Sequence, residues 1–322
     1  MKYYYAPLEG ITGYRYRNLY ARHFGRIDKY FTPFLSPSLE TSIHPKERRD
    51  ILPENNQGLP VVPQILANRA EVFLPTARAL HEMGYQEVNL NLGCPSRTVV
   101  SKGKGSGFLA KPEALDAFLD AVFSKADLKI SVKTRIGKDS AEEFPALMEI
   151  FNKYPIHELI IHPRAQKDYY KNTPDWNCFG EALRISKNPV CYNGDLFTAK
   201  DYEHFTETFP EAEAVMFGRG LLGNPALVRE IRGEGALEKT EFRAFHDELL
   251  ATYRSAFEED KNALFKMKEF WCYAIHVFSD NRKYAKKIRK AERLDAYLDA
   301  VNALFAEQEI VKAVLKGKKN SQ

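Results

Sequence analysis

The chain has 322 residues, of which 44% are hydrophobic and 28% are charged, and no stretch approaches the ~18–20 apolar residues that a membrane-spanning helix needs. Its 47 basic and 43 acidic residues give a net charge of +4, which by itself is too small to imply a polyanionic partner. The amino terminus, MKYYYAPLEG, lacks the charged, apolar and small-residue segments of a secretory signal, so we expect a cytoplasmic protein.

Eight short apolar or β-branched runs are typical of β-strands and occupy residues 3–5, 29–31, 61–65, 87–90, 129–132, 158–161, 189–192 and 214–217. Segments with helical periodicity lie between most of them, such as 69–83, 113–123, 141–153 and 198–208. Strands that alternate with helices over about 235 residues match a (β/α)8 barrel, for which ~250 residues is typical. A doubly wound sheet is the competing topology.

Unusual polar residues cluster where these strands end. Seven of the eight runs contribute, through Pro7 and Glu9, Gln64, Asn91 and Cys94, Lys133 and Arg135, His162 and Arg164, Asn193 and Asp195, and Gly218 and Arg219. A doubly wound sheet gathers its ligand contacts from two or three strands, whereas a barrel collects them all around its carboxyl-end mouth. The sequence therefore favours an α/β fold with a (β/α)8 TIM barrel over residues 1–235.

The pattern changes after residue 235 to long helices without strands, from about Phe242 to Leu315, which indicates an all-helical domain over residues 240–322. Within it the segment RKYAKKIRKAER, residues 282–293, has seven positive charges and one Glu. Charges on a solvated helix face usually alternate in sign. We therefore interpret this segment as a binding site for a phosphate backbone, and a plain solvated face is the alternative.

The four cysteines, Cys94, Cys178, Cys191 and Cys272, have no CxxC spacing and indicate neither a disulfide framework nor a zinc site. Cys191 lies in an apolar run and Cys272 in an amphipathic helix, so both are expected to be small buried hydrophobes. Cys94 instead follows its strand in a Gly-Cys-Pro turn. That location favours chemistry over packing.

The last two strands each end in a glycine-containing turn that leads into a helix, in VCYNGD and AVMFGRG. Such turns aim free backbone N–H groups at one point, here beside Arg219, and predict a phosphate site of the kind that many (β/α)8 barrels form after their last strands. Two tight turns with a surface arginine are the alternative. No GxxxxGK[ST] or GxGxxG motif follows a strand, so a Walker loop or Rossmann site is not supported.

Lys133, in ISVKTRIG, ends a central strand, so its charge needs an acceptor inside the barrel mouth. A flavin supplies one, because a cation near the N1 and O2 edge stabilises the anionic reduced ring. The Gln64 amide can donate and accept at the pyrimidine edge of the same ring, and His162 joins them from the sixth strand. A Schiff base on Lys133 is the rival interpretation.

Cys94 gains a role as a proton donor from the same arrangement. At an ordinary pKa near ~8.5 its thiol is mostly protonated at neutral pH, and it can protonate one carbon of a polarised C=C bond after hydride adds to the other. The glycine-rich SKGKGSG that follows is interpreted as a mobile lid. Its Lys102 and Lys104, with Arg97, either meet an anionic substrate or provide solubility.

In their order these motifs resemble the tRNA-dihydrouridine synthases. APLEGIT is similar to that family's amino-terminal APM-x-G-VT flavin segment, NLNLGCPS to its N-x-GCP active-site loop, VKTRIG to its K-x-R-x-G, and IIHPRAQKDYY to its H-[GP]-R motif. CYNGD and MFGRG are similar to its paired phosphate turns, and the helical tail agrees with its tRNA-binding domain. The matches run in order over residues 3–225, and the joint presence of six motifs is specific.

The resemblance implies bound FMN, NADPH as reductant and reduction of a uracil base in tRNA to 5,6-dihydrouracil. By matching position, Cys94 is the acid that protonates C5 after hydride from reduced FMN reaches C6, and Asn91 and Arg135 face the uracil edge. The implied flavin contacts are Pro7, Leu8, Glu9, Gln64, Lys133 and His162, with Asn193, Gly194, Asp195, Gly218 and Arg219 at the ribityl-phosphate end.

Contacts to tRNA are expected at the pocket edge and on the helical tail. The expected residues are Arg164, Tyr169 and Tyr170, the loop lysines Lys102 and Lys104, and Arg282, Lys286, Arg289 and Arg293. The chain departs from the family at Gly13, where Asp is frequent, and at Leu8, Ala165 and Asp168. The alternatives are a small-molecule FMN oxidoreductase of the dihydroorotate dehydrogenase type and a non-catalytic RNA-binding barrel. Neither a membrane nor an obligate protein partner is indicated.

Overall fold

The computed structural model describes residues 1–25 and 27–311. Its strands, in chain order, are β1 (Lys2–Tyr5), β2 (Lys29–Phe31), β3 (Val61–Val62), β4 (Gln64–Ile65), β5 (Glu87–Leu92), β6 (Lys129–Arg135), β7 (Leu159–His162), β8 (Val190–Tyr192) and β9 (Ala214–Phe217). Each of the eight runs predicted from the sequence forms a strand or, in one case, two.

Within the described residues the strands pair in parallel, in the order β3-β2-β1-β9-β8-β7-β6-β5-β4. The two ends of this order, β3 and β4, are separated along the chain only by Pro63, so the sheet forms a nearly closed barrel. Proline has no N–H to donate to a ladder, which splits the third strand, although the Pro63 carbonyl still accepts the N–H of Asn89 at 2.8 Å. The predicted (β/α)8 TIM barrel is confirmed.

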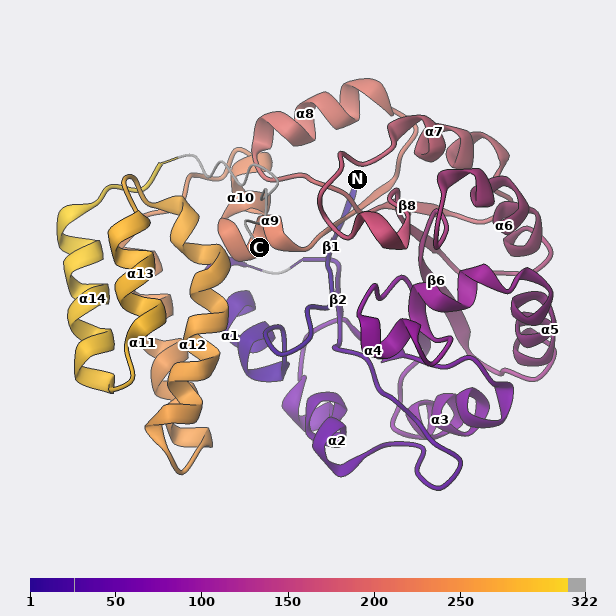
Figure 1. The fold of residues 1–322 in the computed structure, drawn as a ribbon, viewed down its shortest axis with the longest axis horizontal. Helices are drawn as coiled ribbons and strands as arrows, with labels where there is room; N and C mark the ends of the chain where they lie inside the picture. Colours follow the sequence, from indigo (N-terminus) through magenta and orange to yellow (C-terminus); the bar gives the residue numbers. More distant parts are fainter. Residues whose placement is uncertain (26, 312–322) are drawn as a thin grey trace.

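Helices surround the strands as an outer ring (Figure 1). The helices of the barrel region are α1 (Tyr14–Phe24), α2 (Pro45–Ile51), α3 (Ala70–Glu82), α4 (Arg97–Val100), α5 (Pro112–Phe123), α6 (Phe144–Phe151), α7 (Trp176–Ile185), α8 (Ala199–Thr208), α9 (Arg219–Gly223) and α10 (Leu227–Ile231), and α4 lies inside the ring. Short 3-10 turns are η1 (Pro53–Asn55), η2 (Gly105–Ala110), η3 (Ala141–Glu143) and η4 (Gln166–Asp168). The four predicted helical segments correspond to α3, α5, η3 with α6, and α8.

The start of α8 illustrates how the sequence sets a helix boundary. Thr198 Oγ1 accepts the backbone N–H of Asp201 at 3.1 Å, and the Asp201 carboxylate accepts the N–H of Thr198 at 2.8 Å. This reciprocal capping box satisfies N–H groups that have no partner inside the helix. The chain therefore begins α8 directly after the residues that enter the barrel mouth.

The apolar core has two parts, because alternate strand residues point inward and outward. Outward residues such as Tyr5 and Val215 pack against the helices in one large cluster. Inward residues form a smaller cluster made of Tyr4, Ala6, Phe31, Val62, Ile160, Cys191, Ala214 and Met216. This inner cluster fills the barrel and provides a floor for the mouth.

Strand register aligns the polar residues at the carboxyl ends. Asn91 of β5 lies opposite Lys133 of β6, and Arg135 of β6 lies opposite His162 of β7. Because neighbouring parallel strands end at the same edge of the sheet, these side chains meet although they are far apart in the sequence. The register thus assembles one site from several strands.

Four further helices, α11 (Lys239–Ala256), α12 (Asp260–Ala274), α13 (Arg282–Lys290) and α14 (Leu294–Glu307), with the turn η5 (Ile275–Val277), stand beside the barrel (Figure 1). An aromatic seam joins them to α1, where the Phe245 ring centroid lies 5.8 Å from that of Tyr16 and 5.0 Å from that of Phe24. The expected helical region is therefore present. Its separate folding as a domain stays a prediction, and the expected helix end at Leu315 lies outside the described residues.

No helix in the described part of the chain is long and apolar enough to cross a membrane.

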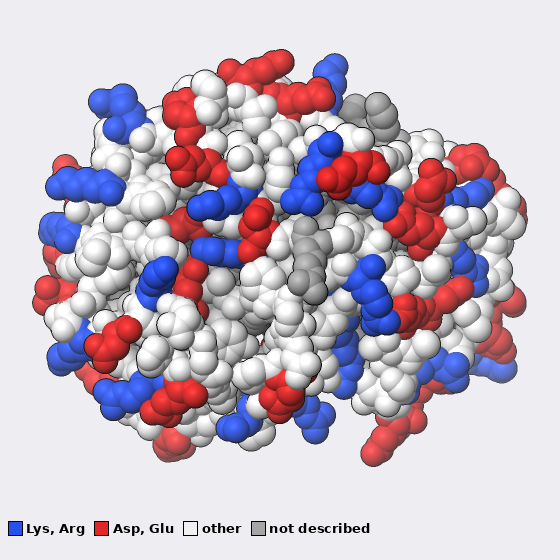
Figure 2. All heavy atoms as spheres, turned by 180° about the vertical axis from the view of Figure 1, so that it is seen from behind, with Lys and Arg blue, Asp and Glu red and all other residues white. Residues whose placement is uncertain are grey.

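On the face turned away from the view of Figure 1, Lys and Arg side chains are interspersed with Asp and Glu (Figure 2). That face therefore carries no broad field of one sign, as the small net charge of +4 leads one to expect.

Candidate active site

A cavity of about 270 Å³ opens at the carboxyl ends of the barrel strands. Residues from eight strand ends line it, one more than the seven that the sequence predicts, because Pro33 and Phe34 after β2 also contribute. The predicted site residues among them are Pro7, Leu8, Glu9, Gln64, Asn91, Cys94, Lys133, Arg135, His162, Asn193, Gly194, Asp195, Gly218 and Arg219. Their roles toward a cofactor or substrate stay predictions.

The turn after β5 is built around the side chain of Asn91. Its Oδ1 accepts the backbone N–H groups of Gly93 at 3.1 Å and Cys94 at 2.9 Å. Ser106 donates its N–H at 3.2 Å and its hydroxyl at 2.8 Å to the Cys94 carbonyl. Both sides of the cysteine are therefore fixed by hydrogen bonds.

Burial raises the pKa of the Cys94 thiol, although the nearby charges of Arg135 and Lys133 act in the opposite direction. Removing a thiolate from water costs more than removing a neutral thiol, so a half-buried cysteine keeps its proton. At neutral pH the Cys94 side chain is thus a neutral thiol.

A chain of amides connects the Cys94 turn to the third strand. Asn91 Nδ2 donates to Gln64 Oε1 at 2.7 Å, and Gln64 Nε2 donates to Asn89 Oδ1 at 2.8 Å. Asn89 Nδ2 in turn donates to Ser131 Oγ at 3.0 Å. Gln64 and Asn89 are fully buried, so this chain fixes the orientation of the amides that face the cavity.

Lys133 enters the cavity from β6 without a hydrogen-bond or ion-pair partner among residues 1–25 and 27–311. Burial, with the neighbouring guanidinium of Arg135, lowers the pKa of its ammonium to about 8. A nearby hydrogen-bond acceptor or negative charge raises the pKa of such an amine, so that it is fully protonated at neutral pH. Lys133 is therefore ready to pair with a ligand.

Arg135 is almost fully buried and uses its guanidinium to connect loops. It donates to the backbone carbonyls of Gly93, Ala165 and Tyr169, each at 3.0 Å. These bonds join the Cys94 turn to the loop after β7. Tyr169 has a positive φ of 50°, a conformation that is strained for a residue with a side chain.

The strained backbone at Tyr169 leaves the next side chain, Tyr170, at the mouth of the cavity. The Tyr170 ring lies under two guanidinium groups, with 4.5 Å from its centroid to Cζ of Arg219 and 5.5 Å to Cζ of Arg135. Tyr169 itself does not line the cavity in the described structure. The tyrosine that lies at the pocket edge is thus Tyr170.

His162, Arg164 and Asp195 form a hydrogen-bonded chain, in which His162 and the half-buried Asp195 line the cavity. Arg164 donates from Nη1 to His162 Nε2 at 3.0 Å and from both terminal nitrogens to the Asp195 carboxylate. Burial and the surrounding cations, led by Arg135, hold the pKa of His162 well below its usual range, so its ring is neutral. Arg164 is only 2% exposed and does not line the cavity, so it lies behind the pocket wall rather than at the pocket edge.

The turns after β8 and β9 form a corner with donors that are unpaired in the described structure, a candidate anion-binding corner. The backbone N–H groups of Gly194, Asp195, Arg219 and Gly220 have no acceptor within the described residues. Arg219 lies beside them, and its Nη2 also donates to Asp195 Oδ1 at 2.5 Å. Free N–H groups next to a guanidinium are what a phosphate requires.

Glycine is required where these two turns approach each other. A Cβ at Gly220 would lie 2.2 Å from the Leu196 carbonyl oxygen, and one at Gly194 would lie 2.0 Å from the Tyr192 hydroxyl. Neither position has room for a side chain. Gly220 therefore permits the close contact between the two turns, and Gly194 leaves room for the Tyr192 hydroxyl beneath its own turn.

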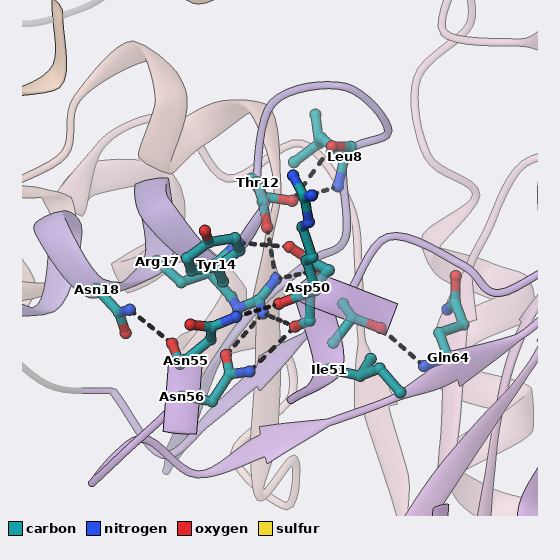
Figure 3. Close-up of polar contacts among 12 residues, drawn as sticks. Leu8, Thr12, Tyr14, Arg17, Asn18, Asp50, Ile51, Asn55, Asn56 and Gln64 are labelled. Atoms are coloured by element: carbon teal, nitrogen blue, oxygen red, sulfur yellow. Dashed lines mark hydrogen bonds and ion pairs between the residues drawn. The ribbon is translucent and has the colours of Figure 1, made fainter. Parts of the chain in front are cut away.

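A polar network fixes the β1–α1 turn, which supplies Leu8 and Glu9 to the cavity (Figure 3). The buried Arg17 guanidinium donates to the Thr12 carbonyl and to Asp50 Oδ2, each at 2.8 Å. Thr12 Oγ1 accepts the N–H of Leu8 at 2.8 Å. Helix α1 thereby holds the turn in place.

Asp50 also explains the departure from the family at Gly13. Its Oδ1 accepts the N–H of Tyr14 at 2.5 Å and so caps α1, which has no side-chain cap of its own. A Cβ at Gly13 would lie 3.1 Å from that same oxygen. The carboxylate at this helix start thus comes from α2 instead of from residue 13.

The loop after Cys94 differs from the mobile lid that the sequence predicts. Gly105, Ser106 and Gly107 are buried, and a Cβ at Gly105 would lie 2.8 Å from the Cys94 carbonyl. This half of SKGKGSG packs against the turn that holds Cys94, because Ser106 donates two hydrogen bonds to the Cys94 carbonyl. Lys102 is exposed and Lys104 half-buried, and neither lines the cavity.

Three aromatic residues of the cavity were not predicted from the sequence, and the first of them is Phe34, which follows β2. Phe197 follows the β8 turn, and its ring centroid lies 5.3 Å from Cζ of Arg219. Tyr273 comes from α12 and reaches the cavity from the C-terminal region. The position of Phe197 just after the glycine turn was a usable signal, whereas nothing local to Tyr273 indicates a barrel contact.

The other three cysteines have different environments, and Cys178 is half-buried with its thiol donating to Asp175 Oδ2 at 3.3 Å. Cys191 is fully buried in the barrel interior, which confirms the prediction for it. Cys272 is exposed, so the prediction of a buried small hydrophobe is wrong there. It lies on α12 between Trp271, which packs into the helical core, and Tyr273, which lines the cavity, so its side chain points to solvent.

The family model for dihydrouridine synthase (Dus) matches residues 4–319 of this chain. The chain belongs to the dihydrouridine synthase family. The resemblance inferred from the six ordered motifs is thereby confirmed.

Individual relatives agree with the dihydrouridine synthase assignment over nearly the whole chain. A probable tRNA-dihydrouridine synthase of Staphylococcus aureus (strain COL) is 27% identical over 312 residues, which cover 94% of this chain and 93% of that protein. A probable tRNA-dihydrouridine synthase 2 of Bacillus subtilis (strain 168) is 26% identical over 303 residues, 91% of this chain and 92% of the relative.

Solved structures resemble this dihydrouridine synthase family member at the level of the fold. Morphinone reductase in complex with tetrahydroNAD superposes with a TM-score of 0.52 at 11% identity, over 75% of this chain and 90% of the other. At that identity the likeness shows the shared barrel alone.

Proposed function

We propose that this chain reduces a specific uridine of tRNA to 5,6-dihydrouridine in the cytoplasm, with FMN bound in the barrel mouth and NADPH as the reductant. The observation that carries the proposal is that one cavity of about 270 Å³ gathers the Cys94 thiol, the unpaired Lys133 ammonium and the anion-binding corner beside Arg219. Membership of the dihydrouridine synthase family supports the same reaction.

The described residues fit FMN in two respects. The Lys133 ammonium has no acceptor of its own, and the N1 and O2 edge of a flavin offers one. The free N–H groups at Gly194 and Gly220, with Arg219, suit the ribityl phosphate. Gln64, His162 and Asn193 lie between these two ends of the cavity wall, and Pro7, Leu8, Glu9, Asp195 and Gly218 complete it.

The proposed chemistry separates hydride and proton delivery. When bound, reduced FMN supplies the hydride for uracil C6. Cys94 supplies the proton, so that a C–H bond forms at C5 as the S–H bond breaks. Burial keeps the thiol protonated before this step, and the Arg135 and Lys133 charges stabilise the thiolate that remains after it.

Asn91 and Arg135 are assigned a positioning role in this step, because both hold the turn that carries Cys94. Asn91 holds the Cys94 backbone, and Arg135 joins the Cys94 turn to the loop that bears Tyr170. Both also line the cavity, where the remaining N–H groups of their side chains can meet the uracil carbonyls. Tyr170 offers an aromatic face to the base, as RNA-binding proteins commonly do.

Recognition of tRNA is assigned to the C-terminal helices over residues 240–322 and to the loop after Cys94, with residues 1–235 as the catalytic barrel. Arg282, Lys286 and Arg289 of α13 are exposed and have no ion pair among the described residues, whereas Arg293 pairs with Asp295 at 2.5 Å. Unpaired cations of this kind attract a phosphate backbone.

A second group of cations, which includes the lysines of the loop after Cys94, also favours an anionic partner. Burial, together with the charges of Lys102 and Arg69, lowers the pKa of Lys104. An RNA phosphate beside this group of cations would remove their mutual repulsion. Such backbone contacts offset the few kcal/mol that extrusion of a stacked base into the cavity costs.

The proposal is tested with the purified full chain, its absorbance spectrum, and tRNA from a strain that lacks this protein. We expect a yellow protein with a flavin spectrum, and dihydrouridine in the tRNA by mass spectrometry only when NADPH is present. A colourless protein that FMN cannot reconstitute, or a flavoprotein that oxidises dihydroorotate and leaves tRNA unchanged, would contradict it.

A further inference from the structure

A second cavity, of about 840 Å³, opens directly beside the first. Its walls come from the β1–α1 turn, the segment after β2, helix α2, and helices α11 and α12 with the residue that follows α11. Glu9, Ile11, Pro33 and Phe34 line both cavities. A single ridge of side chains therefore separates them, and a molecule held in one extends readily into the other.

Aromatic rings and an arginine guanidinium line part of this second cavity. The guanidinium carbon of Arg15 lies 4.6 Å from the Tyr14 ring centroid, and both side chains are half-buried. The Tyr253 and Phe257 rings stack on each other with centroids 6.3 Å apart. Aromatic rings and arginine planes are the groups on which splayed nucleobases stack.

The charged residues of this cavity leave an excess of unpaired cations. Asp50 is occupied by Arg17 and by the N–H of Tyr14, whereas Glu47 Oε1 accepts the N–H of Ser36 at 3.1 Å and its buried Oε2 has no partner in the described residues. Arg15, Lys46 and Arg49 have no ion pair within the described ranges, and the last two are exposed on α2.

Two further charges complete the lining. Lys266 of α12 donates to the Gly10 carbonyl at 2.7 Å and to Glu269 at 3.1 Å, so it is not available to a ligand. Glu9 is an exposed carboxylate without a hydrogen-bond partner in the described residues, and it stands on the ridge between the cavities. The outer part of the cavity is thus cationic, and the ridge offers an acceptor.

We propose that this second cavity binds the nucleotide next to the reduced uridine in the same RNA strand. Its base stacks on the Tyr14–Arg15 pair, and its phosphate lies beside Lys46 and Arg49. The inference rests on the proposed function, because a base drawn into the first cavity brings its covalently joined neighbour to the ridge. The exposed position of Lys46 and Arg49 leaves the strand a path from the cavity to the surface.

A nicotinamide dinucleotide also has bases and phosphates and could occupy the same cavity. The experiments therefore distinguish binding of RNA from binding of NADPH. In the first experiment, Arg49→Ala is compared with Arg48→Ala. Both arginines are exposed on α2 and neither has an ion pair in the described part of the chain, but only Arg49 lines the cavity. The dissociation constant for tRNA is measured over a range of salt concentrations.

For Arg49→Ala we expect tRNA binding that is ~5-fold weaker or more, with a salt slope about 0.7 to 0.9 smaller, the effect of one lost phosphate contact. Arg48→Ala is expected to differ less from the wild type in both quantities. The rate at which NADPH bleaches the flavin without tRNA is expected to be unchanged in both variants. Equal effects of the two substitutions on tRNA binding, or slower bleaching with normal tRNA binding, would overturn the proposal.

The second experiment tests the stacked base. Tyr14→Ala is combined with a synthetic tRNA that lacks the base on one or the other side of the target uridine. In the wild type one of these abasic substrates should bind ~5-fold to 100-fold more weakly, and in Tyr14→Ala the loss should be much smaller. Fully additive effects on both sides would overturn the stacking site. A wild-type protein that neither binds tRNA nor reduces it would instead reject the proposed function.

Discussion

The Oδ1 atom of Asn91 accepts the backbone N–H of Cys94 at 2.9 Å, while Nδ2 of the same side chain donates to Gln64 at 2.7 Å. One amide therefore connects Cys94, the proposed proton donor, to Gln64 of the predicted flavin edge. The direction in which the Cys94 thiol points depends on this side chain, which itself is almost fully buried.

Replacing Asn91 with Ala should slow uridine reduction by ~10-fold to 100-fold, because a displacement near 1 Å at a reacting group has effects of that order. FMN content should stay close to that of the wild type. Asn91→Asp keeps the acceptor for the Cys94 N–H, so it should recover part of the rate. Single-turnover rates for the three proteins check this, and an Asp variant as slow as the Ala variant would contradict it.

Cys94→Ala should retain FMN and tRNA binding and lose ~10²-fold to 10⁴-fold in the rate of uridine reduction, the usual contribution of a positioned general acid. The reduction of bound FMN by NADPH should proceed at the wild-type rate, since that step needs no proton from Cys94. Separate rapid-mixing measurements of the two half-reactions check both statements. Wild-type turnover in the variant would disprove the acid role.

FMN affinity should depend on pH through Lys133. The amine is charged below its pKa of about 8, and pairing with the flavin raises that pKa in the complex. The apoprotein therefore binds FMN more weakly as pH rises above about 8, because it must first take up a proton.

The quenching of FMN fluorescence between pH 6 and 9.5 measures this affinity. The Lys133→Met variant should bind more weakly, with a flat pH profile over the same range. A wild-type profile that is equally flat would show that the Lys133 charge does not contribute to binding.

The thiols should differ in their reactivity with iodoacetamide at pH 7. Cys272 is exposed and should be alkylated first. Burial raises the pKa of Cys94, and the pKa of Cys178, beside Asp175, is raised to about 12, so both contain little thiolate. Cys191 is fully buried and should be protected. Peptide mass spectrometry over time gives the order, and faster labelling of Cys94 than of Cys272 would argue against a protonated acid.

The helical region should lose stability on replacement of Tyr297 with Phe. Tyr297 is fully buried, and its hydroxyl accepts the N–H of Trp271 at 2.8 Å and contacts Nε2 of His246 at 2.7 Å. Without it the buried Trp271 donor has no partner, which costs about 1–3 kcal/mol.

Urea denaturation followed by tryptophan fluorescence gives the change in free energy of unfolding. Tyr253→Phe is the matched control, because no hydrogen bond from the Tyr253 hydroxyl is present in the described structure while its ring is also buried. A loss no larger than that of the control would refute the assignment of the hydrogen bonds as stabilising.

The positions of the strands and the residues at their ends follow from the sequence for a physical reason. A parallel barrel needs each strand to be followed by a helix, so polar residues after successive strands must gather at one rim. Lys133, His162 and Asn193 were predicted together on that basis and line one cavity. The split third strand was within reach as well, because Pro63 stands in the middle of the run.

Side-chain partners were harder to predict because they depend on loop conformation. Arg164 follows a strand like the other site residues, but the loop turns its side chain to Asp195 and away from the cavity. The exposure of Tyr170 in place of Tyr169 depends on one residue with φ of 50°. Neither outcome is encoded by residue type or spacing.

The sequence by itself determined the barrel, its catalytic rim and the family, because each of these follows from short segments in a fixed order. Only the tertiary structure decided what the C-terminal helices add: Tyr273 in the first cavity, and the hydrogen bond from Lys266 to Gly10 beside the second. The Lys266–Gly10 bond joins residues 256 positions apart, and both features depend on how the aromatic seam of α1 and α11 orients the helices against the barrel. That orientation is a property of the whole packed interface, which no local pattern contains.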